Sequence, residues 1–406
     1  MKAEIITTGT EIMIGSILNT NSKFLSSKLS DLGIEPCYHT SVEDSVEKLS
    51  SVIRIALDRA DVIITTGGLG PTEDDLTKET IAKVLGLELE KDIDLEHEIY
   101  KRFKRMNVTM SNNNRKQALK PKGSILIKND NGTAPGIFLE YNNKKLIMLP
   151  GPPNEMIPMF NDYVTPMLIT DSNIIISSIN TIGIGESNLE EKLKNLDIYE
   201  DNFNISTYAK SGTVEIKIIG KSDNKEALNH KINEKIKVIK DNFNDYIYGF
   251  DNKSIAEIVV DLLREKNMQL SLCESCTGGL ISSKITSVPG ASRVFDRAIV
   301  TYSNNAKIHE LNVSVDTLER YGAVSEETAF EMAKGLLNKT DSDIVLSVTG
   351  IAGPDGGSKE KPVGLVYFCV MNRKEYKVIK NIFSGNRATI QERAAIKSLF
   401  EIQKFI

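Results

Sequence analysis

The fold is decided by Cys273-Glu274-Ser275-Cys276-Thr277-Gly278-Gly279. This stretch follows a short apolar run, residues 268–272, and precedes an apolar segment that begins at Leu280. That order predicts a strand, a tight polar turn and a helix. Open α/β sheets bind their ligands at the carboxyl ends of strands. The turn therefore presents its hydroxyl groups where a binding site is expected.

Ser275 is the residue of this turn that we expect to act as a nucleophile. Gly278 and Gly279 would let a substrate approach the backbone closely. The amide groups at the start of the following helix can hold an anion, or an oxyanion that develops at a reacting carbonyl. The simpler alternative is that the serine and threonine only cap the helix. The turn alone leaves both interpretations open, so the rest of the chain has to decide.

The composition is that of an ordinary globular protein. Its 406 residues suggest about two to four domains. The net charge of -5 gives no electrostatic case for direct nucleic-acid binding. We see no apolar run long enough to cross a bilayer and no signal-peptide layout at the N-terminus. We therefore expect a cytoplasmic protein without a membrane or nucleic-acid partner.

The cysteines leave a second interpretation of the turn open. The chain has four, Cys37, Cys273, Cys276 and Cys369, which are too few and too scattered for a disulfide framework. Cys273 and Cys276 form a C-x-x-C pair, and such a pair raises the possibility of redox chemistry. Here the pair encloses Glu274-Ser275 and runs into glycines, outside a thioredoxin-like context. A structural zinc site would need two further ligands.

The first part of the chain alternates between strand and helix patterns. The predicted strands are residues 3–8, 34–40 and 62–66, the predicted helices are 21–32 and 46–59, and Gly9-Thr10-Glu11 is predicted as a turn. Later strands are predicted at 137–140 and 146–149, and residues 112–117 form a polar, basic cluster. This alternation predicts a mostly parallel sheet with helices on both faces.

A glycine-rich loop, residues 67–75, joins a predicted strand to the helix predicted at 76–85. It reads Gly-Gly-Leu-Gly-Pro-Thr-Glu-Asp-Asp. Such a loop before a helix suits a phosphate. Asp74 and Asp75 suit a hard cation that bridges to phosphate oxygens, although acidic residues in a first turn also simply stabilise a helix. The pattern is neither a P-loop nor a dinucleotide fingerprint, which argues against ATP hydrolysis and NAD-dependent redox chemistry.

Four segments together resemble the MogA/MoaB-like molybdopterin-binding domain, and more specifically its version in CinA proteins. They are residues 8–11, 67–75, 132–136 and 149–156. The resemblance implies an ADP-ribose pyrophosphatase that uses a divalent metal, magnesium or cobalt. It implies that Glu11, Asp74 and Asp75 lie near the metal. The phosphate-binding residues that it implies are Gly67, Gly68, Gly70, Thr72, Lys116 and Gly151.

The pattern of predicted strands and helices changes near residue 174. Predicted strands at 204–208 and 214–219 and a charged helix at 225–240 indicate a small α+β unit. Gly183-Ile184-Gly185-Glu186 is interpreted as a helix start, because a lone short glycine pattern is weak evidence for a nucleotide loop. The unit resembles the KH-like middle domain of CinA proteins, which does not imply RNA binding. The predicted domains are 1–170, 171–250 and 251–406.

A serine nucleophile needs a base, and the sequence limits the choice. Of the four histidines, only His309 lies in the last domain, so a Ser-His-Asp triad would have to use it. Lys307 and Tyr302 are better candidates. A partly desolvated lysine can lose its proton near neutral pH, and the tyrosine could relay that proton. A lysine on a solvated helix face is the simpler alternative.

Further polar segments follow in the last domain. Thr349, Gly350 and the amides of the glycine-rich stretch 349–357 could bind a phosphate or an oxyanion. Arg387, just before the last predicted helix, could clamp a phosphate with two parallel hydrogen bonds. An ordinary surface arginine is the alternative. The last domain is predicted to be α/β.

These segments resemble the C-terminal CinA domain, which is similar to nicotinamide mononucleotide (NMN) deamidase. The resemblance implies hydrolysis of NMN to nicotinic acid mononucleotide and ammonia without a metal, in recycling of NAD. It implies Ser275 as the nucleophile, with Tyr302 and Lys307 as partners. The substrate-binding residues that it implies are Glu274, Thr277, Gly278, Gly279, Thr349, Gly350 and Arg387. Where the family usually has a second arginine, this chain has Gln391.

Three other interpretations remain. The first domain could bind a pterin or nucleotide without turning it over. The Cys273/Cys276 pair could make a redox protein. The family's name suggests a part in DNA uptake or repair, against which the acidic charge balance argues. The expected partners are NMN and ADP-ribose, and relatives suggest a homodimer.

Overall fold

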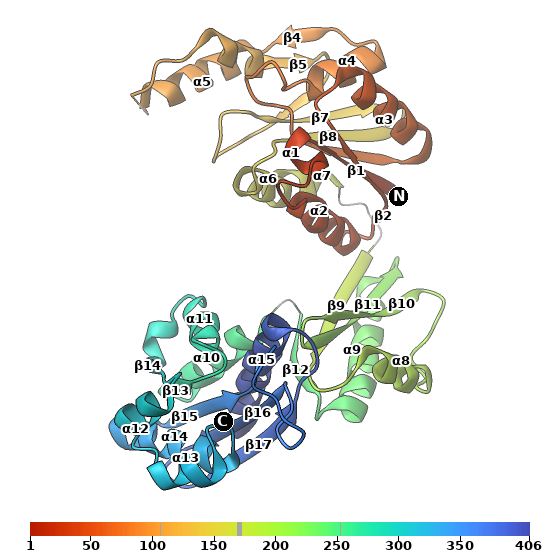
Figure 1. Cartoon of the computed structure of the whole chain (residues 1–406). Coiled ribbons are helices and arrows are strands. Elements are labelled where there is room, and N and C mark those ends of the chain that lie inside the picture. The colour runs from red at the N-terminus through yellow and green to blue at the C-terminus, as the bar shows by residue number, and fades with distance from the viewer. Residues whose placement is uncertain (106, 169–172, 252) are drawn as a thin grey trace. The chain divides into compact units, whose positions relative to one another are not determined.

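The computed structural model describes residues 1–105, 107–168, 173–251 and 253–406 (Figure 1). The chain divides into two compact units, Met1–Ile174 and Ile175–Ile406. The second unit contains a small sheet followed in the chain by a larger one. Across the described ranges, no helix is long and apolar enough to span a membrane.

The first unit is built on a mixed sheet whose central strands are parallel. Its strands in spatial order are β2 (Glu35–Val42), β1 (Lys2–Thr8), β3 (Val62–Thr66), β8 (Lys144–Leu149), β7 (Gly136–Tyr141) and β6 (Ile125–Ile127). β1 pairs in parallel with β2 and β3, and β3 pairs in parallel with β8. β7 and β6 are antiparallel. The carboxyl ends of the parallel strands share one edge, so the loops after Thr8, Thr66 and Leu149 meet there.

Helices cover both faces of this sheet, as predicted. One face carries α2 (Thr20–Asp31), α6 (Pro153–Met159), a π-helical turn (Phe160–Val164) and α7 (Thr165–Leu168), and the other carries α3 (Val46–Arg59) and α4 (Thr77–Leu85). Successive side chains of a strand point to opposite faces. Ile5 accordingly packs with Leu25 in one core, and Ile6 packs with Ile53 in the other. The result is the predicted three-layer αβα arrangement.

An extension and a short helix complete this unit. The extension contains β4 (Leu89–Lys91), α5 (Ile93–Arg105), a 3₁₀ helix (Asn112–Ala118) and β5 (Leu119–Pro121). The turn predicted at Gly9-Thr10-Glu11 is wrong, because a short helix, α1 (Thr10–Met13), begins there. The amide and hydroxyl of Thr10 donate to Asp44 from a distant loop. A local pattern could not reveal this contact.

The small sheet of the second unit has helices packed on it. Its elements are β9 (Asn173–Thr181), α8 (Glu186–Lys194), β10 (Phe203–Lys210), β11 (Thr213–Ser222), α9 (Lys225–Phe243) and β12 (Ile247–Phe250), with strand order β10-β11-β9-β12. β11 alternates between buried and half-exposed residues. Val214, Ile216 and Ile218 share a core with Leu228 and Ile232 of α9. This is the predicted α+β unit.

The last sheet carries helices on both faces. Its spatial order is β14 (Phe295–Val300), β13 (Leu270–Glu274), β15 (Ile344–Gly350), β16 (Leu365–Met371) and β17 (Tyr376–Ile382). One core involves α10 (Ile255–Glu265), α11 (Leu280–Thr286), the 3₁₀ turn Ala291–Arg293 and α15 (Arg387–Phe405), and the other involves α12 (Asn304–Leu311), α13 (Val315–Tyr321) and α14 (Glu326–Lys339). β13 is parallel to β14 and β15. The loops after Glu274, Val300 and Gly350 therefore leave the sheet at one edge.

Candidate functional site

Ser275 and Lys307 lie in hydrogen-bond contact. Ser275 is in the turn after β13 and is 7% exposed. Lys307 comes from α12, is 1% exposed, and its Nζ lies 3.1 Å from Ser275 Oγ and 2.8 Å from the Thr301 carbonyl oxygen. Burial lowers the pKa of Lys307, because the charged form loses its hydration. A lysine in this state can accept the proton of the serine hydroxyl.

A buried carboxylate, that of Glu274, holds the backbone of the turn. Its side chain accepts hydrogen bonds from the Thr277 hydroxyl at 2.7 Å and from the amides of Gly279, Ile281 and Ser282 at 3.0, 3.2 and 2.9 Å. The Ser282 hydroxyl also donates to it. These donors compensate a carboxylate that is fully buried. Glu274 thus occupies the helix N-terminus that the sequence analysis assigned to an anionic ligand.

This arrangement corrects four of the predicted substrate contacts. Glu274 and Thr277 lie inside the turn, so they fix the backbone around Ser275. Gly278 and Gly279 have φ values of 62° and 95°, which glycine adopts readily. The Gly278 amide donates to the Ser275 carbonyl and the Gly279 amide to Glu274, so both amides have partners within the turn.

Tyr302 and Arg387 form an open side of the site. Tyr302 is 61% exposed, and its hydroxyl accepts a hydrogen bond from Arg387 Nη2 at 2.8 Å. Arg387 Nη1 donates to the Gly353 carbonyl at 2.9 Å, which joins the loop after β15 to this pair. Tyr302 directly follows Thr301, whose carbonyl holds Lys307. The polar chain Ser275–Lys307–Thr301–Tyr302–Arg387 therefore runs from a buried hydroxyl to exposed groups.

Thr349 and Gly350 both have structural roles at the end of β15. The Thr349 hydroxyl is buried and donates to the Ala323 carbonyl at 2.6 Å, so it is already engaged. A Cβ on Gly350 would lie 2.8 Å from the Leu365 carbonyl oxygen. Glycine at this position lets β15 and β16 approach each other.

The sequence analysis noted Gln391 only as a departure from the family pattern. Its Nε2 donates to the Cys276 carbonyl at 2.7 Å. Glu274 and Gln391 thus hold the backbone on the two sides of Ser275. A glutamine at this position supplies a neutral donor to a carbonyl, so here the residue contacts the turn itself.

The alternative chemistries of this domain are disfavoured by burial and position. Cys273 and Cys276 are free thiols. Burial raises the pKa of Cys276 to about 12 and that of Cys273 well above its usual value, so both thiols stay protonated at neutral pH. His309 is exposed and follows Lys307 by two residues on α12. Residues two apart do not share a helix face, so His309 points away from Ser275.

The first unit has a cavity of about 480 Å³ at the carboxyl edge of its sheet, which we call the glycine-loop pocket. The predicted site residues that line it are Gly67, Gly68, Gly70, Thr72, Gly151, Glu11, Asp74 and Asp75. Gly67 and Gly68 must be glycines, because neighbouring atoms lie too close for a Cβ. A Cβ on Gly67 would lie 2.4 Å from the Thr8 carbonyl oxygen, and one on Gly68 would lie 2.3 Å from Thr77 Oγ1.

Lys116 has a different place from the one predicted. Its Nζ donates to the Thr72 carbonyl at 3.0 Å and to the Asp75 carbonyl. Asp75 in turn accepts from the amide and hydroxyl of Thr72, at 2.8 and 2.6 Å. Lys116 does not line the pocket, so it holds the loop in shape where a contact with a diphosphate was predicted.

The acidic lining of this pocket bears on the predicted metal. Its carboxylates are those of Glu11, Asp44, Asp74, Asp75 and Glu155, with no lysine or arginine among the lining residues that the structure describes. Carboxylate oxygens are the ligands that hard cations prefer. As placed, however, no three acidic, histidine or cysteine groups of the described chain converge on one point. The predicted ligands Glu11, Asp74 and Asp75 therefore do not make a formed metal centre as they are placed.

Gln117 and Thr133 also line this pocket and were not predicted as site residues. Gln117 is 2% exposed and donates to Thr133 Oγ1 at 3.2 Å, whereas its Oε1 is buried without a hydrogen-bond partner. A buried acceptor without a donor is costly unless a ligand or water supplies one. Both residues lie in segments that the sequence analysis quoted, residues 112–117 and 132–136, but their pairing across the fold left no local signal.

We predict that Glu274→Gln destabilises the last domain and lowers its activity together. The glutamine side chain would have only one acceptor oxygen, and its NH₂ group would face some of the amide and hydroxyl donors that now bind Glu274. Leaving buried donors unpaired costs about 1–3 kcal/mol each. The melting temperature should therefore fall by several degrees in a calorimetric scan.

Ser282→Ala is the matched control, because it removes one of the donors and keeps the carboxylate. It should lose about 1 kcal/mol of unfolding free energy. Equal effects of the two substitutions would show that the carboxylate does not hold the turn.

Comparisons with known proteins cover the chain from end to end. Sequence profiles match residues 4–170 as a probable molybdopterin binding domain, 177–249 as a damage-inducible protein CinA KH domain, and 252–406 as a CinA C-terminal domain. Among solved structures, the competence/damage inducible protein CihA from Agrobacterium tumefaciens is 39% identical, with a TM-score of 0.35. It covers 36% of this chain and 90% of its own.

Two relatives align with nearly the whole chain. A CinA-like protein from Dictyoglomus thermophilum is 46% identical over 98% of both chains. A putative competence-damage inducible protein from Caldicellulosiruptor saccharolyticus is 45% identical over 100% of this chain and 99% of its own. With these relatives and the three profiles in order along the sequence, the chain belongs to the CinA family.

Proposed function

We propose that the last domain hydrolyses the carboxamide of nicotinamide mononucleotide, giving nicotinic acid mononucleotide and ammonia. The reaction would return a product of NAD breakdown to NAD synthesis. The observation that carries this proposal is the 3.1 Å contact between Ser275 Oγ and the buried Nζ of Lys307. Amide hydrolysis through an acyl-enzyme needs a hydroxyl beside a base, and this pair supplies both.

The reaction begins when neutral Lys307 takes the proton of Ser275 as Oγ attacks the carboxamide carbon. The C–O bond forms while the carbonyl π electrons move to oxygen. When the tetrahedral intermediate collapses, the C–N bond breaks and Lys307 returns its proton to the departing nitrogen, so that ammonia leaves. A water molecule, deprotonated by the same lysine, then attacks the acyl carbon. The C–Oγ bond breaks, Lys307 returns the proton to Ser275 Oγ, and nicotinic acid mononucleotide leaves. The Thr301 carbonyl keeps the amine oriented throughout.

The phosphate and the oxyanion need their own donors. Arg387 is exposed beside Tyr302 and can turn toward a phosphate. The Gly278 and Gly279 amides are already used. The Ile351 amide is also used, since it donates to the Leu365 carbonyl. The loop beyond Ile351, which Arg387 contacts at Gly353, is the remaining candidate for an oxyanion site.

We predict that Ser275→Ala lowers ammonia release from NMN by about a thousandfold or more, because the nucleophile is removed. The assay uses the full chain with EDTA present, since no metal enters the proposed reaction. Ser283→Ala, an exposed position on α11, is the control and should keep wild-type turnover. Full turnover by Ser275→Ala would remove this serine from the mechanism, and loss of wild-type turnover in EDTA would contradict the metal-free reaction.

We also predict that kcat/KM rises with pH through an apparent pKa below the ordinary lysine value of 10.5. The base must be neutral, and burial lowers its pKa, so the active form gains population as pH increases. In Lys307→Arg the guanidinium stays protonated and cannot act as a base, so activity should fall by about 100- to 10,000-fold. A flat profile from pH 6 to 9 in the wild type would argue against Lys307 as the base.

For the first domain we propose binding of a phosphorylated nucleotide in the glycine-loop pocket, with ADP-ribose as the candidate ligand. This is supported by the eight predicted residues that line one cavity and by the unpaired Oε1 of Gln117 beside them. The proposal includes hydrolysis of the diphosphate of this ligand; Glu11, Asp74 and Asp75 would supply carboxylate oxygens to a divalent cation, magnesium or cobalt, which would neutralise phosphate charge. The alternative is a pterin or nucleotide bound without turnover.

We predict that Gly151→Leu abolishes ADP-ribose binding. A Cβ at this position meets only Gly67 Cα at 3.7 Å, an ordinary contact, so the side chain can fill the pocket without backbone strain. Calorimetric titration measures the binding. Ammonia release from NMN and the melting temperature should be unchanged. Wild-type affinity in this variant would show that the ligand binds outside the glycine-loop pocket. Cleavage of ADP-ribose that continues in EDTA would show that the reaction needs no divalent metal.

A further inference from the structure

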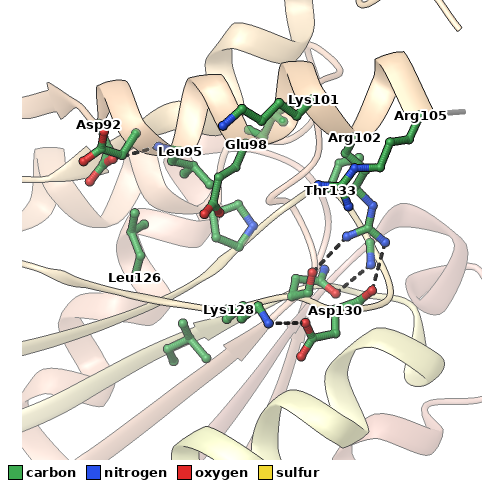
Figure 2. Close-up of a pocket in the computed structure, with 16 residues that line it drawn as sticks. Asp92, Leu95, Glu98, Lys101, Arg102, Arg105, Leu126, Lys128, Asp130 and Thr133 are labelled. Atoms are coloured by element: carbon green, nitrogen blue, oxygen red, sulfur yellow. Dashed lines mark hydrogen bonds and ion pairs between the residues drawn. The ribbon is translucent and has the colours of Figure 1, made fainter. Parts of the chain in front are cut away.

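A cavity of about 850 Å³ lies in the first unit between α5 and the segment 126–135 (Figure 2). Its lining contains four cationic side chains and four carboxylates, namely Lys101, Arg102, Arg105 and Lys128 with Asp92, Asp94, Glu98 and Asp130. Lys128 pairs with Asp130 at 2.6 Å, and Arg102 donates to two carbonyls of the loop, each at 3.0 Å. These charges are balanced and partly engaged, so the lining selects neither an anionic nor a cationic ligand. The second unit contains a more informative set of contacts, which connects its small sheet with the open side of the proposed site.

The last helix of the chain, α15, is docked on the small sheet. Toward the end of the helix, Gln403 Nε2 donates to the Tyr248 carbonyl of β12 at 2.7 Å. Tyr248 also belongs to the same hydrophobic core as Leu399 and Phe400 of α15. These contacts fix the C-terminal half of α15 relative to the sheet.

The turn between β10 and β11 reaches the middle of the same helix. This turn contains Gly212, whose φ of 82° suits glycine. A Cβ at this position would lie 3.2 Å from Ile396 Cδ1 and 3.4 Å from Arg393 Cγ. Because glycine has no side chain, the turn can lie directly on Arg393.

Arg393 connects this contact with the phosphate side of the proposed site. Its Nη1 donates to the Ser384 carbonyl at 2.8 Å and to the Ser384 hydroxyl at 3.0 Å. Ser384 lies in the loop between β17 and α15, three residues before Arg387. The aliphatic part of Arg393 thus lies against the small sheet, while its guanidinium holds the loop that leads to Arg387.

Arg387 is the first residue of α15, so its place depends on both the helix and the loop before it. Its guanidinium donates to the Tyr302 hydroxyl at 2.8 Å and to the Gly353 carbonyl at 2.9 Å. Asn386 caps the helix by accepting from the Thr389 amide at 2.9 Å. A displacement of about 1 Å in a group that orients a substrate can cost about 100-fold in rate. The support of this loop therefore matters for the reaction.

We infer that Arg393 is a positioning residue for Arg387, and that the small sheet acts on the proposed site through it. Arg393 keeps the loop before α15, and with it the start of the helix, in the place from which Arg387 meets the phosphate. The inference rests on the proposed deamidation, with Arg387 as the phosphate-binding group. A change at Arg393 should therefore weaken substrate binding and leave the chemical step at Ser275 intact.

The test measures steady-state turnover of NMN by four forms of the full chain: wild type, Arg393→Gln, Arg387→Gln and the double variant. In Arg393→Gln, KM should rise by about tenfold while kcat stays within about twofold, because only binding is weakened. In the Arg387→Gln background, the same change should alter KM by less than about twofold, because residues that act through one another are not additive. Arg320→Gln removes a guanidinium from an exposed ion pair with Asp316 on α13, and this control should keep the wild-type KM.

A second variant, Gly212→Asn, tests the part of the small sheet without changing α15. Asparagine tolerates a positive φ, so the added side chain acts mainly by pressing on Arg393. KM for NMN should rise in this variant, and it should rise no further when Arg393→Gln is added. Gly123→Asn is the matched control, because Gly123 has a φ of 83° and no atom within 4 Å of an added Cβ.

The outcomes separate this inference from the proposal beneath it. Absence of Ser275-dependent turnover of NMN in the wild type overturns the deamidation and the inference together. With that turnover present, a KM of Arg393→Gln equal to that of Arg320→Gln overturns the positioning role alone. Additive effects of Arg393→Gln and Arg387→Gln also overturn it. A wild-type KM in Gly212→Asn overturns the action of the small sheet.

Discussion

One buried carboxylate supports the chemistry of the last domain. Glu274 ends β13 inside the protein, where an uncompensated charge would be costly. Amides at the start of α11 and the hydroxyls of Thr277 and Ser282 compensate it, so strand, turn and helix are joined through one side chain. Ser275 is carried by this joined backbone. Its rigidity fixes the 3.1 Å contact to Lys307, on which proton transfer depends.

Lys307 shows the reverse relation between burial and function. A buried amine is costly to protonate, and this is the property that a base near neutral pH requires. The neighbouring Cys276 thiol is also buried, but burial raises its pKa to about 12. The nucleophilic thiolate form is therefore scarcely populated at neutral pH. In the reaction that we propose, the same environment would favour proton transfer from Ser275 to Lys307, and it keeps the Cys276 thiol protonated.

The helices and strands could largely be predicted from the sequence, but the contacts of individual site residues could not. The predicted helix 46–59 and the predicted strand 62–66 have the observed bounds, because periodicity and capping residues are local signals. The helix at Thr10 was missed because Asp44, which accepts from its first amide, comes from another loop. Thr349 and Lys116 were predicted to contact ligand. Their partners, Ala323 and the glycine loop, are distant in sequence, so no local pattern revealed that these groups were engaged.

The sequence by itself determined the order of strands and helices, the glycine-rich turns at strand ends and the residue types gathered there. These follow from side-chain size, backbone freedom and hydrophobic spacing, which act over a few residues. Only the tertiary structure decided which groups meet. Parallel strands bring the ends of β13, β14 and β15 to one edge, and burial there sets which side chain is a base, which is a scaffold and which faces a ligand. Desolvation and hydrogen bonding between distant segments make that decision, and neither can be read from neighbours in the chain.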